Sequence, residues 1–104
     1  MYVVMNRVMV NSDWADKFVE RFAKRKGQID KEPGFVSMQV LKPEESGTPF
    51  VVFTSWQDKA SFKQWVNSDD FKLAHQNPMP TEAFSEGGGL ETFDVVVSSE
   101  DTPE

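Results

Sequence analysis

The sequence predicts an α+β fold in which helices cover one face of a four-stranded sheet. Four short runs rich in β-branched and aromatic residues indicate strands, and two regions with apolar residues at helical spacing indicate helices. These segments follow one another in the order β-α-β-β-α-β. The chain has 104 residues, which suffice for one domain with its own core but not for two.

The first strand is expected at residues 2–10. This stretch, YVVMNRVMV, is largely apolar on both faces and too short for a helix of such hydrophobicity, so it predicts a central strand. Asn6 lies in phase with Val4 and Val8. Strand interiors disfavour asparagine. Asn6 therefore indicates either a β-bulge or an amide bonded to a neighbouring loop, or else a hydrogen-bond donor that faces a pocket.

A helix is expected next, with Ser12 or Asp13 as its N-cap and Ile29 near its end. Its apolar stripe consists of residues at spacings of four and seven, namely Trp14, Phe18, Phe22 and Ile29. Arg25 lies near the middle of this stripe, where a guanidinium either extends into solvent or meets an anion at a pocket edge. Five of the eleven basic residues occur on this helix: Lys17, Arg21, Lys24, Arg25 and Lys26.

A turn at residues 32–34 precedes a second strand, which is expected at 35–42. The third strand is expected at 50–56, where the sequence FVVFTSW is strongly apolar. The polar segment 43–49 between them contains Gly47 and predicts a hairpin connection.

Two short helices are expected to carry Trp65 and His75. Asp58 predicts the N-cap of the first helix and Ser68 that of the second. Phe71 and His75 share the apolar face of the second helix. A lone histidine on such a face is more often a core or capping residue than a metal ligand, so this helix alone favours a structural role.

The last part of the chain predicts a loop, a strand and a tail. Residues 77–89 are rich in proline and glycine and lack periodicity, which is typical of a functional or mobile loop. A fourth strand is expected at 90–98. The folded domain should therefore span residues 1–98, and the acidic segment 99–104 predicts a disordered tail.

Charge and composition exclude several classes of function. A net charge of -6 and a pI near 4.7 argue against general binding to nucleic acid or to anionic membrane surfaces. The absence of cysteine excludes disulfides and thiolate chemistry. No secretion signal or apolar run of bilayer length is evident, so we expect a soluble, cytoplasmic protein.

The element order corresponds to the split βαβ, or ferredoxin-like, arrangement. Its helices can cover only one face of the sheet. The first and third strands are apolar on both faces, so the uncovered face needs a partner. An isologous homodimer is the simplest way to supply one.

Three motifs and Asn6 together carry a resemblance to a known family. The motifs are RFAKR at 21–25, PGF at 33–35 and FKQWVNSDDFKLAH at 62–75. With the strand order, they resemble the antibiotic-biosynthesis-monooxygenase superfamily, and within it the IsdG-type haem-degrading monooxygenases. The resemblance covers residues 2–97. It implies a ferredoxin-like domain that dimerises into an α+β barrel.

The resemblance also implies a haem site. It assigns Asn6, Trp65 and His75 to catalysis, with His75 as the ligand of the haem iron. Asn6 would donate a hydrogen bond to bound dioxygen, and Trp65 would press the macrocycle out of plane. Arg21 and Arg25 would meet the haem propionates, and Phe22 would contact the haem beside them.

The implied reaction uses haem as both substrate and cofactor. It consumes dioxygen and electrons from an external reductase, opens the porphyrin ring and releases iron. Two other functions stay open from the residues alone. One is a cofactor-independent oxygenase of the same superfamily that acts on a quinol or an anthrone, and the other is a haem carrier or sensor without turnover.

Overall fold

The computed structural model describes residues 1–24, 27, 29–76 and 78–99. These residues form a four-stranded antiparallel sheet in the order β2-β3-β1-β4. The strands are β1 (Tyr2–Val10), β2 (Phe35–Leu41), β3 (Phe50–Trp56) and β4 (Phe84–Asp94). The α-helices are α1 (Ala15–Ala23), α2 (Lys59–Val66) and α3 (Asp69–Ala74), and 3-10 turns occur at Ser12–Trp14, Ile29–Lys31 and Thr81–Ala83.

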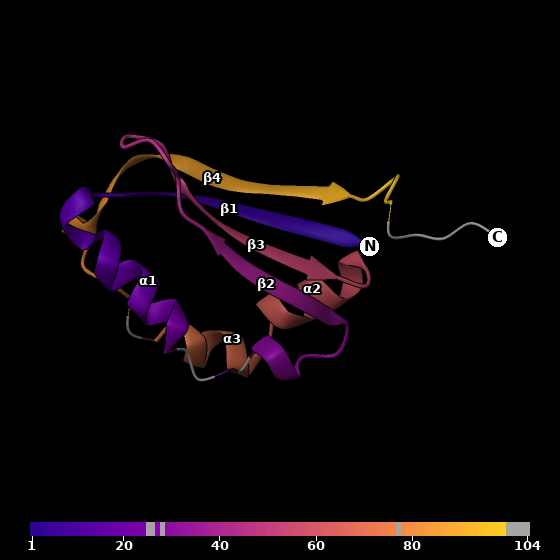
Figure 1. The fold of residues 1–104 in the computed structure, drawn as a ribbon. Helices are drawn as coiled ribbons and strands as arrows, with labels where there is room; N and C mark the ends of the chain where they lie inside the picture. The colour runs from indigo at the N-terminus through magenta and orange to yellow at the C-terminus, as the bar shows by residue number, and fades with distance from the viewer. Residues whose placement is uncertain (25–26, 28, 77, 100–104) are drawn as a thin grey trace.

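Figure 1 shows the three α-helices on the same side of the sheet, as the ferredoxin-like arrangement requires. The predicted α+β fold, the first strand and the third strand are confirmed, and the second strand ends one residue early. Apart from Ser99, the predicted acidic tail lies outside the described residues. No helix among the described residues is long and apolar enough to cross a bilayer.

The hydrophobic core lies between the sheet and α2. Trp56 of β3 is completely buried, and Tyr2 and Val4 of β1 pack with it against Trp65 of α2. A second contact anchors α1, because the ring of Phe18 meets those of Phe22 and Phe50 at centroid distances of 5.1 and 5.0 Å. Large aromatic side chains therefore attach both helical segments to the sheet.

The helix α1 is shorter than the sequence suggested, and its predicted N-cap was wrong. Residues 12–14 form a 3-10 turn, and no side chain caps α1 at Trp14. The helix ends at Ala23 rather than near Ile29. Gly27 has a φ of 77°, which a right-handed helix cannot accommodate and which glycine adopts without strain.

The strand β4 begins earlier than predicted, because three glycines that indicated a loop take part in the sheet. Gly88 pairs with Val8, and the register shifts between Val8 and Val10. A Cβ atom on Gly88 would lie 2.2 Å from the backbone oxygen of Arg7. Only glycine permits this close approach, so the residues that signalled a loop allow the strand to form.

The strand β4 also ends earlier than predicted, at Asp94 instead of Ser98. The N–H of Val95 still donates to the carbonyl oxygen of Met1 at 2.9 Å. The backbone pairing between the two strands therefore extends one residue beyond the end of β4.

The face of the sheet opposite the helices is not covered by any described element, and it mixes apolar residues with polar ones such as the ion-paired Arg7 and Glu91. It carries alternate residues of the four strands, including Val3, Met5, Phe53 and Phe93. Phe93 is 44% exposed. An exposed aromatic surface of this kind is typical of an interaction site.

The cap of α2 predicts a specific acid sensitivity. The backbone N–H and the hydroxyl of Ser61 both donate to the Asp58 carboxylate at 2.8 Å. These bonds, the backbone one contributing more, hold the pKa of this carboxyl below its usual value. Asp58 therefore stabilises the fold above its unfolded pKa of about 3.9, and this contribution is lost as the pH falls through the lower folded value.

We expect the melting temperature of the wild type to fall more steeply below about pH 4 than that of Asp58→Asn, since asparagine caps a helix without titrating. Thermal melts of both proteins between neutral and acidic pH check this. Parallel curves would show that the Asp58 cap does not titrate with folding.

Candidate functional site

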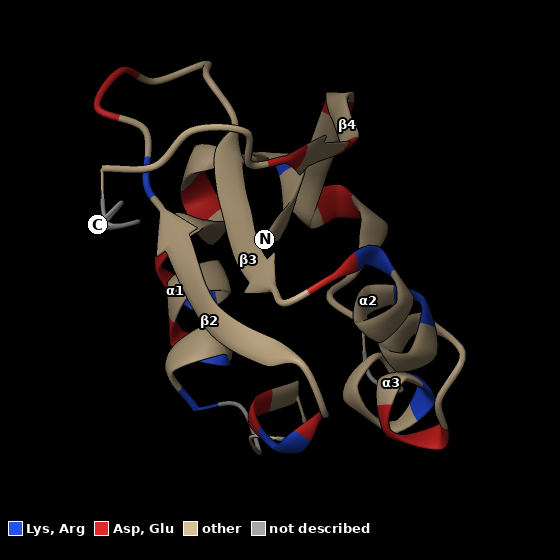
Figure 2. Ribbon diagram, turned by 90° about the vertical axis from the view of Figure 1, so that its right-hand side faces the viewer, with Lys and Arg blue, Asp and Glu red and all other residues tan. Residues whose placement is uncertain are grey.

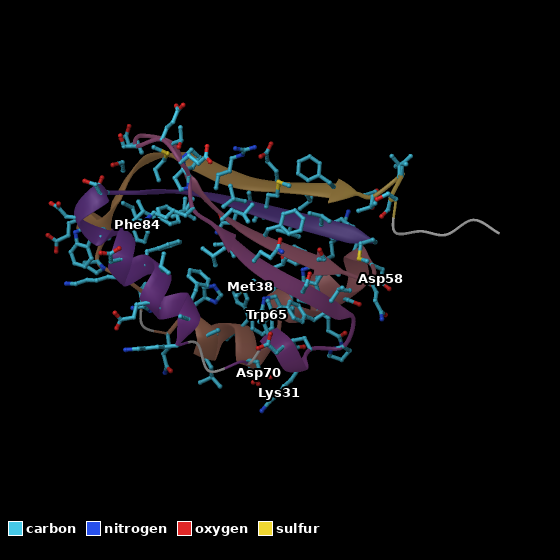
Figure 3. All side chains as sticks on the ribbon, viewed as in Figure 1. Lys31, Met38, Asp58, Trp65, Asp70 and Phe84 are labelled. Atoms are coloured by element: carbon cyan, nitrogen blue, oxygen red, sulfur yellow. The ribbon has the colours of Figure 1, made fainter. Side chains whose placement is uncertain are left out.

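A cavity of about 400 Å³ lies between the sheet and the helices. Its sheet wall comes from β1, β2 and β3, with Leu90 of β4 at one side, and its helical wall comes from α1, α2 and α3. In Figure 3, the labelled Met38 and Trp65 lie in the space between the two layers, whereas Asp70 and Lys31 lie at its outer side. The volume is in the range of pockets for small molecules and cofactors.

One serine hydroxyl joins the two short helices of the helical wall, which lie side by side (Figure 2). Ser68 Oγ accepts from the N–H of Phe71 at 3.1 Å and donates to the carbonyl oxygen of Trp65 at 2.6 Å. The predicted N-cap is thus confirmed, and the same atom satisfies the end of α2. These two hydrogen bonds fix the junction between the helices that carry Trp65 and His75.

The imidazole of His75 is held by the turn that precedes it. Its Nδ1 lies 2.8 Å from the carbonyl oxygen of Phe71, and its ring stacks on the Phe71 ring at a centroid distance of 4.1 Å. A carbonyl can only accept, so Nδ1 carries the proton and Nε2 keeps its lone pair in the neutral ring. His75 lines the cavity and is exposed, so the core role that its position suggested is wrong, whereas the alternative capping role is confirmed because His75 is the C-cap of α3.

Trp65 forms the inner part of the helical wall. It is 5% exposed, and its ring meets Phe71 edge to face at 5.5 Å and 80°. Its other neighbours belong to the core around Trp56. Phe71 consequently contacts both Trp65 and His75 and sets the spacing between them.

Asn6 projects from the opposite, sheet wall. It pairs in regular register with Val52 of β3 and Leu90 of β4, which excludes a β-bulge at this position. Asn6 lines the cavity, and its carboxamide has no hydrogen-bond partner within residues 1–24, 27, 29–76 and 78–99. The observed geometry therefore favours the second sequence interpretation, a polar group that faces a pocket.

The basic edge of the site is described only in part. Arg21 and Phe22 lie in the last turn of α1, and both line the cavity. Arg25, the other candidate for binding an anionic group, lies outside the described residues. Ile29 lines the cavity from a 3-10 turn instead of from α1.

Thr54 is a lining residue that the sequence interpretation missed. It is 9% exposed, and its Oγ1 accepts the indole N–H of Trp56 at 3.0 Å. Threonine is common in strands, so its position within FVVFTSW carried no functional signal. Its alternation with Val52 and Trp56 could only have placed it on the same face as them.

The arrangement combines two kinds of chemistry in one apolar cavity. The helical wall offers a neutral nitrogen at His75 that can ligate a metal, and the sheet wall offers an uncharged amide donor at Asn6. Between them lie Trp65 and other apolar side chains. Such a site suits a largely apolar ligand whose metal ion an imidazole can bind.

Comparison with known proteins places this site in a family context. Residues 1–77 match the model of the antibiotic biosynthesis monooxygenase family. A staphylobilin-producing heme oxygenase from Staphylococcus haemolyticus is 37% identical over 87 residues, covering 82% of this chain and 83% of the relative. A heme-degrading monooxygenase from Shouchella clausii is 30% identical over 99 residues, covering 93% and 92%.

A solved structure extends the likeness to the fold. The heme degrader MhuD from Mycobacterium tuberculosis, with two hemes in its active site, superposes with a TM-score of 0.78 at 26% identity. The superposition covers 94% of this chain and 98% of that one. On these matches, the chain belongs to the antibiotic biosynthesis monooxygenase family.

Proposed function

We propose that this protein is a haem-degrading monooxygenase. The observation that carries the proposal is the placement of His75, with its Nδ1 engaged by Phe71, and of Asn6 on opposite walls of one largely apolar cavity. The names of the two sequence relatives and of the superposed structure support the same activity. Haem, when bound, would supply both the iron that binds dioxygen and the ring that is cleaved.

His75 and Asn6 would hold the two sides of the substrate. His75 is the proposed iron ligand, because its Nδ1–H is already engaged by Phe71 and its Nε2 is available. Asn6 would donate a hydrogen bond from the sheet wall. An amide cannot release a proton as an acid does, so this wall would polarise a ligand without protonating it directly.

Trp65, Phe22 and Arg21 would shape the rest of the haem site. Trp65 is rigid because it is packed into the core, and it would press against the ring and strain it. Phe22 would contact the flat ring. Arg21, together with Arg25, would meet the propionates at the edge next to α1.

Two partners complete the proposal. Ring opening by dioxygen consumes electrons, and the side chains around the cavity are not reductants, so an external reductase would supply them. The apolar face of the sheet would bind a second copy of the chain and form a dimeric α+β barrel, which would remove Phe93 and its neighbours from water.

The ligation of haem tests the proposal directly. We expect wild-type protein titrated with haemin to develop a Soret band that decays, with release of iron, when ascorbate is added in air. His75→Ala should lose the iron–histidine mode in resonance Raman spectra, because no other histidine exists in the chain. A stable Soret band in the wild type would identify a carrier, and no band at all would exclude a haem enzyme.

Trp65 distinguishes strain on the ring from simple packing. Trp65→Phe should cost roughly 1–3 kcal/mol of unfolding free energy, bind haem, and slow single-turnover degradation far more than this loss explains. The buried Phe18 does not line the described cavity, so Phe18→Leu provides a control with a comparable loss of stability. Equal turnover per bound haem in both variants would show that Trp65 only forms part of the pocket wall and does not strain the ring.

The dimer is tested by a charge on the open face. We expect the wild type to sediment as a dimer at micromolar concentration and Phe93→Glu to sediment as a folded monomer, because the carboxylate would be desolvated at the interface. Val19 on α1 is similarly exposed, at 41%, and lies on the other side of the sheet, so Val19→Glu should remain dimeric. A monomeric wild type would contradict the barrel.

A further inference from the structure

Thr54 presents a buried hydroxyl to the cavity, and the described residues account for it as an acceptor but not as a donor. Its Oγ1 accepts the indole N–H of Trp56 at 3.0 Å. A hydroxyl also donates one hydrogen bond, yet no acceptor for Thr54 occurs among the residues that the structure describes. Because Thr54 is only 9% exposed and lines the cavity, its O–H has no access to bulk water except through that space.

The sheet register places this hydroxyl beside Asn6. Asn6 stands opposite Val52, and Thr54 stands opposite Val4, so Asn6 and Thr54 are diagonal neighbours on the same face of β1 and β3. Diagonal neighbours lie roughly 7–8 Å apart at the backbone, and side chains on the same face can bring their polar atoms closer than that. One water molecule bridges polar atoms that are two hydrogen bonds apart, or about 5.6 Å.

The polarity of the two groups matches that bridge. The Thr54 hydroxyl can donate, and the Asn6 carboxamide can both donate and accept. A buried water needs at least two polar partners, and these two side chains supply them on an otherwise apolar stretch of the sheet wall formed with Val4, Val52 and Trp56.

We propose that Thr54 is a positioning residue, which holds a water molecule against the Asn6 carboxamide and thereby orients that amide toward the substrate. The role for catalysis rests on the proposed haem-degrading function. The bridge itself belongs to the ligand-free protein and can be observed there.

The first test is crystallographic and independent of turnover. Crystals of the ligand-free wild type should show a water molecule within hydrogen-bond distance of both Thr54 Oγ1 and the Asn6 carboxamide. Thr54→Ser should retain this water, and the nearly isosteric Thr54→Val should lose it. Its absence from the wild type, or its persistence in Thr54→Val, would overturn the proposal.

The second test separates Thr54's link to Asn6 from its bond to Trp56. Loss of one hydrogen bond predicts that Thr54→Val slows single-turnover degradation per bound haem about five- to tenfold, whereas Thr54→Ser stays within about twofold of wild type. Trp56→Phe removes the indole donor, so Thr54→Val should slow the reaction by the same factor in that background. If the effect of Thr54→Val vanishes there, Thr54 serves Trp56 alone.

The two tests also keep this inference apart from the proposed function. A wild type that fails to degrade haem would refute the function and leave the crystallographic result intact. A wild type that degrades haem, but lacks the bridging water or is indifferent to Thr54→Val, would refute the inference alone.

Discussion

The site depends on the corner at which α2 ends and α3 begins. There a single hydroxyl, that of Ser68, donates to the Trp65 carbonyl in the last turn of α2 and accepts the Phe71 N–H in the first turn of α3. Phe71 then lies between Trp65 and His75 and contacts both rings, and its carbonyl oxygen fixes the tautomer of His75. Local hydrogen bonds thus determine the relative position of two side chains that are ten residues apart, and the buried Trp65 anchors the whole unit to the sheet.

The sheet contributes a different kind of precision. Its cavity wall is built from alternate residues of β1 and β3, whose pairing is continuous past Asn6 and Thr54. A slip of β3 by one residue would turn Thr54 to the face opposite Asn6. The large core around Trp56 opposes such a slip, because it would expose the buried ring to water.

The parts that the sequence predicted correctly are those governed by local rules. Strand alternation around Asn6 and the capping chemistry of Asp58 and Ser68 depend on neighbours in the chain, and these predictions are confirmed. The end of α1 and the start of β4 depend on glycines, whose φ angles only tertiary contacts decide. Thr54 could not be identified as a site residue, because its proposed role depends on its bond to Trp56 and on its position next to Asn6. Asn6 belongs to another strand, so the sequence around Thr54 does not reveal this neighbour. Arg25 stays a prediction.

Because the two site helices are short, the binding of a ligand in the cavity is coupled to the stability of the whole fold. α2 has eight residues and α3 has six, and isolated helices shorter than about 12–15 residues are marginal in water. They therefore form only while the sheet supports them, and His75 has a defined place only in the folded chain. Any compound that fills the cavity must consequently raise the stability of the whole domain by mass action.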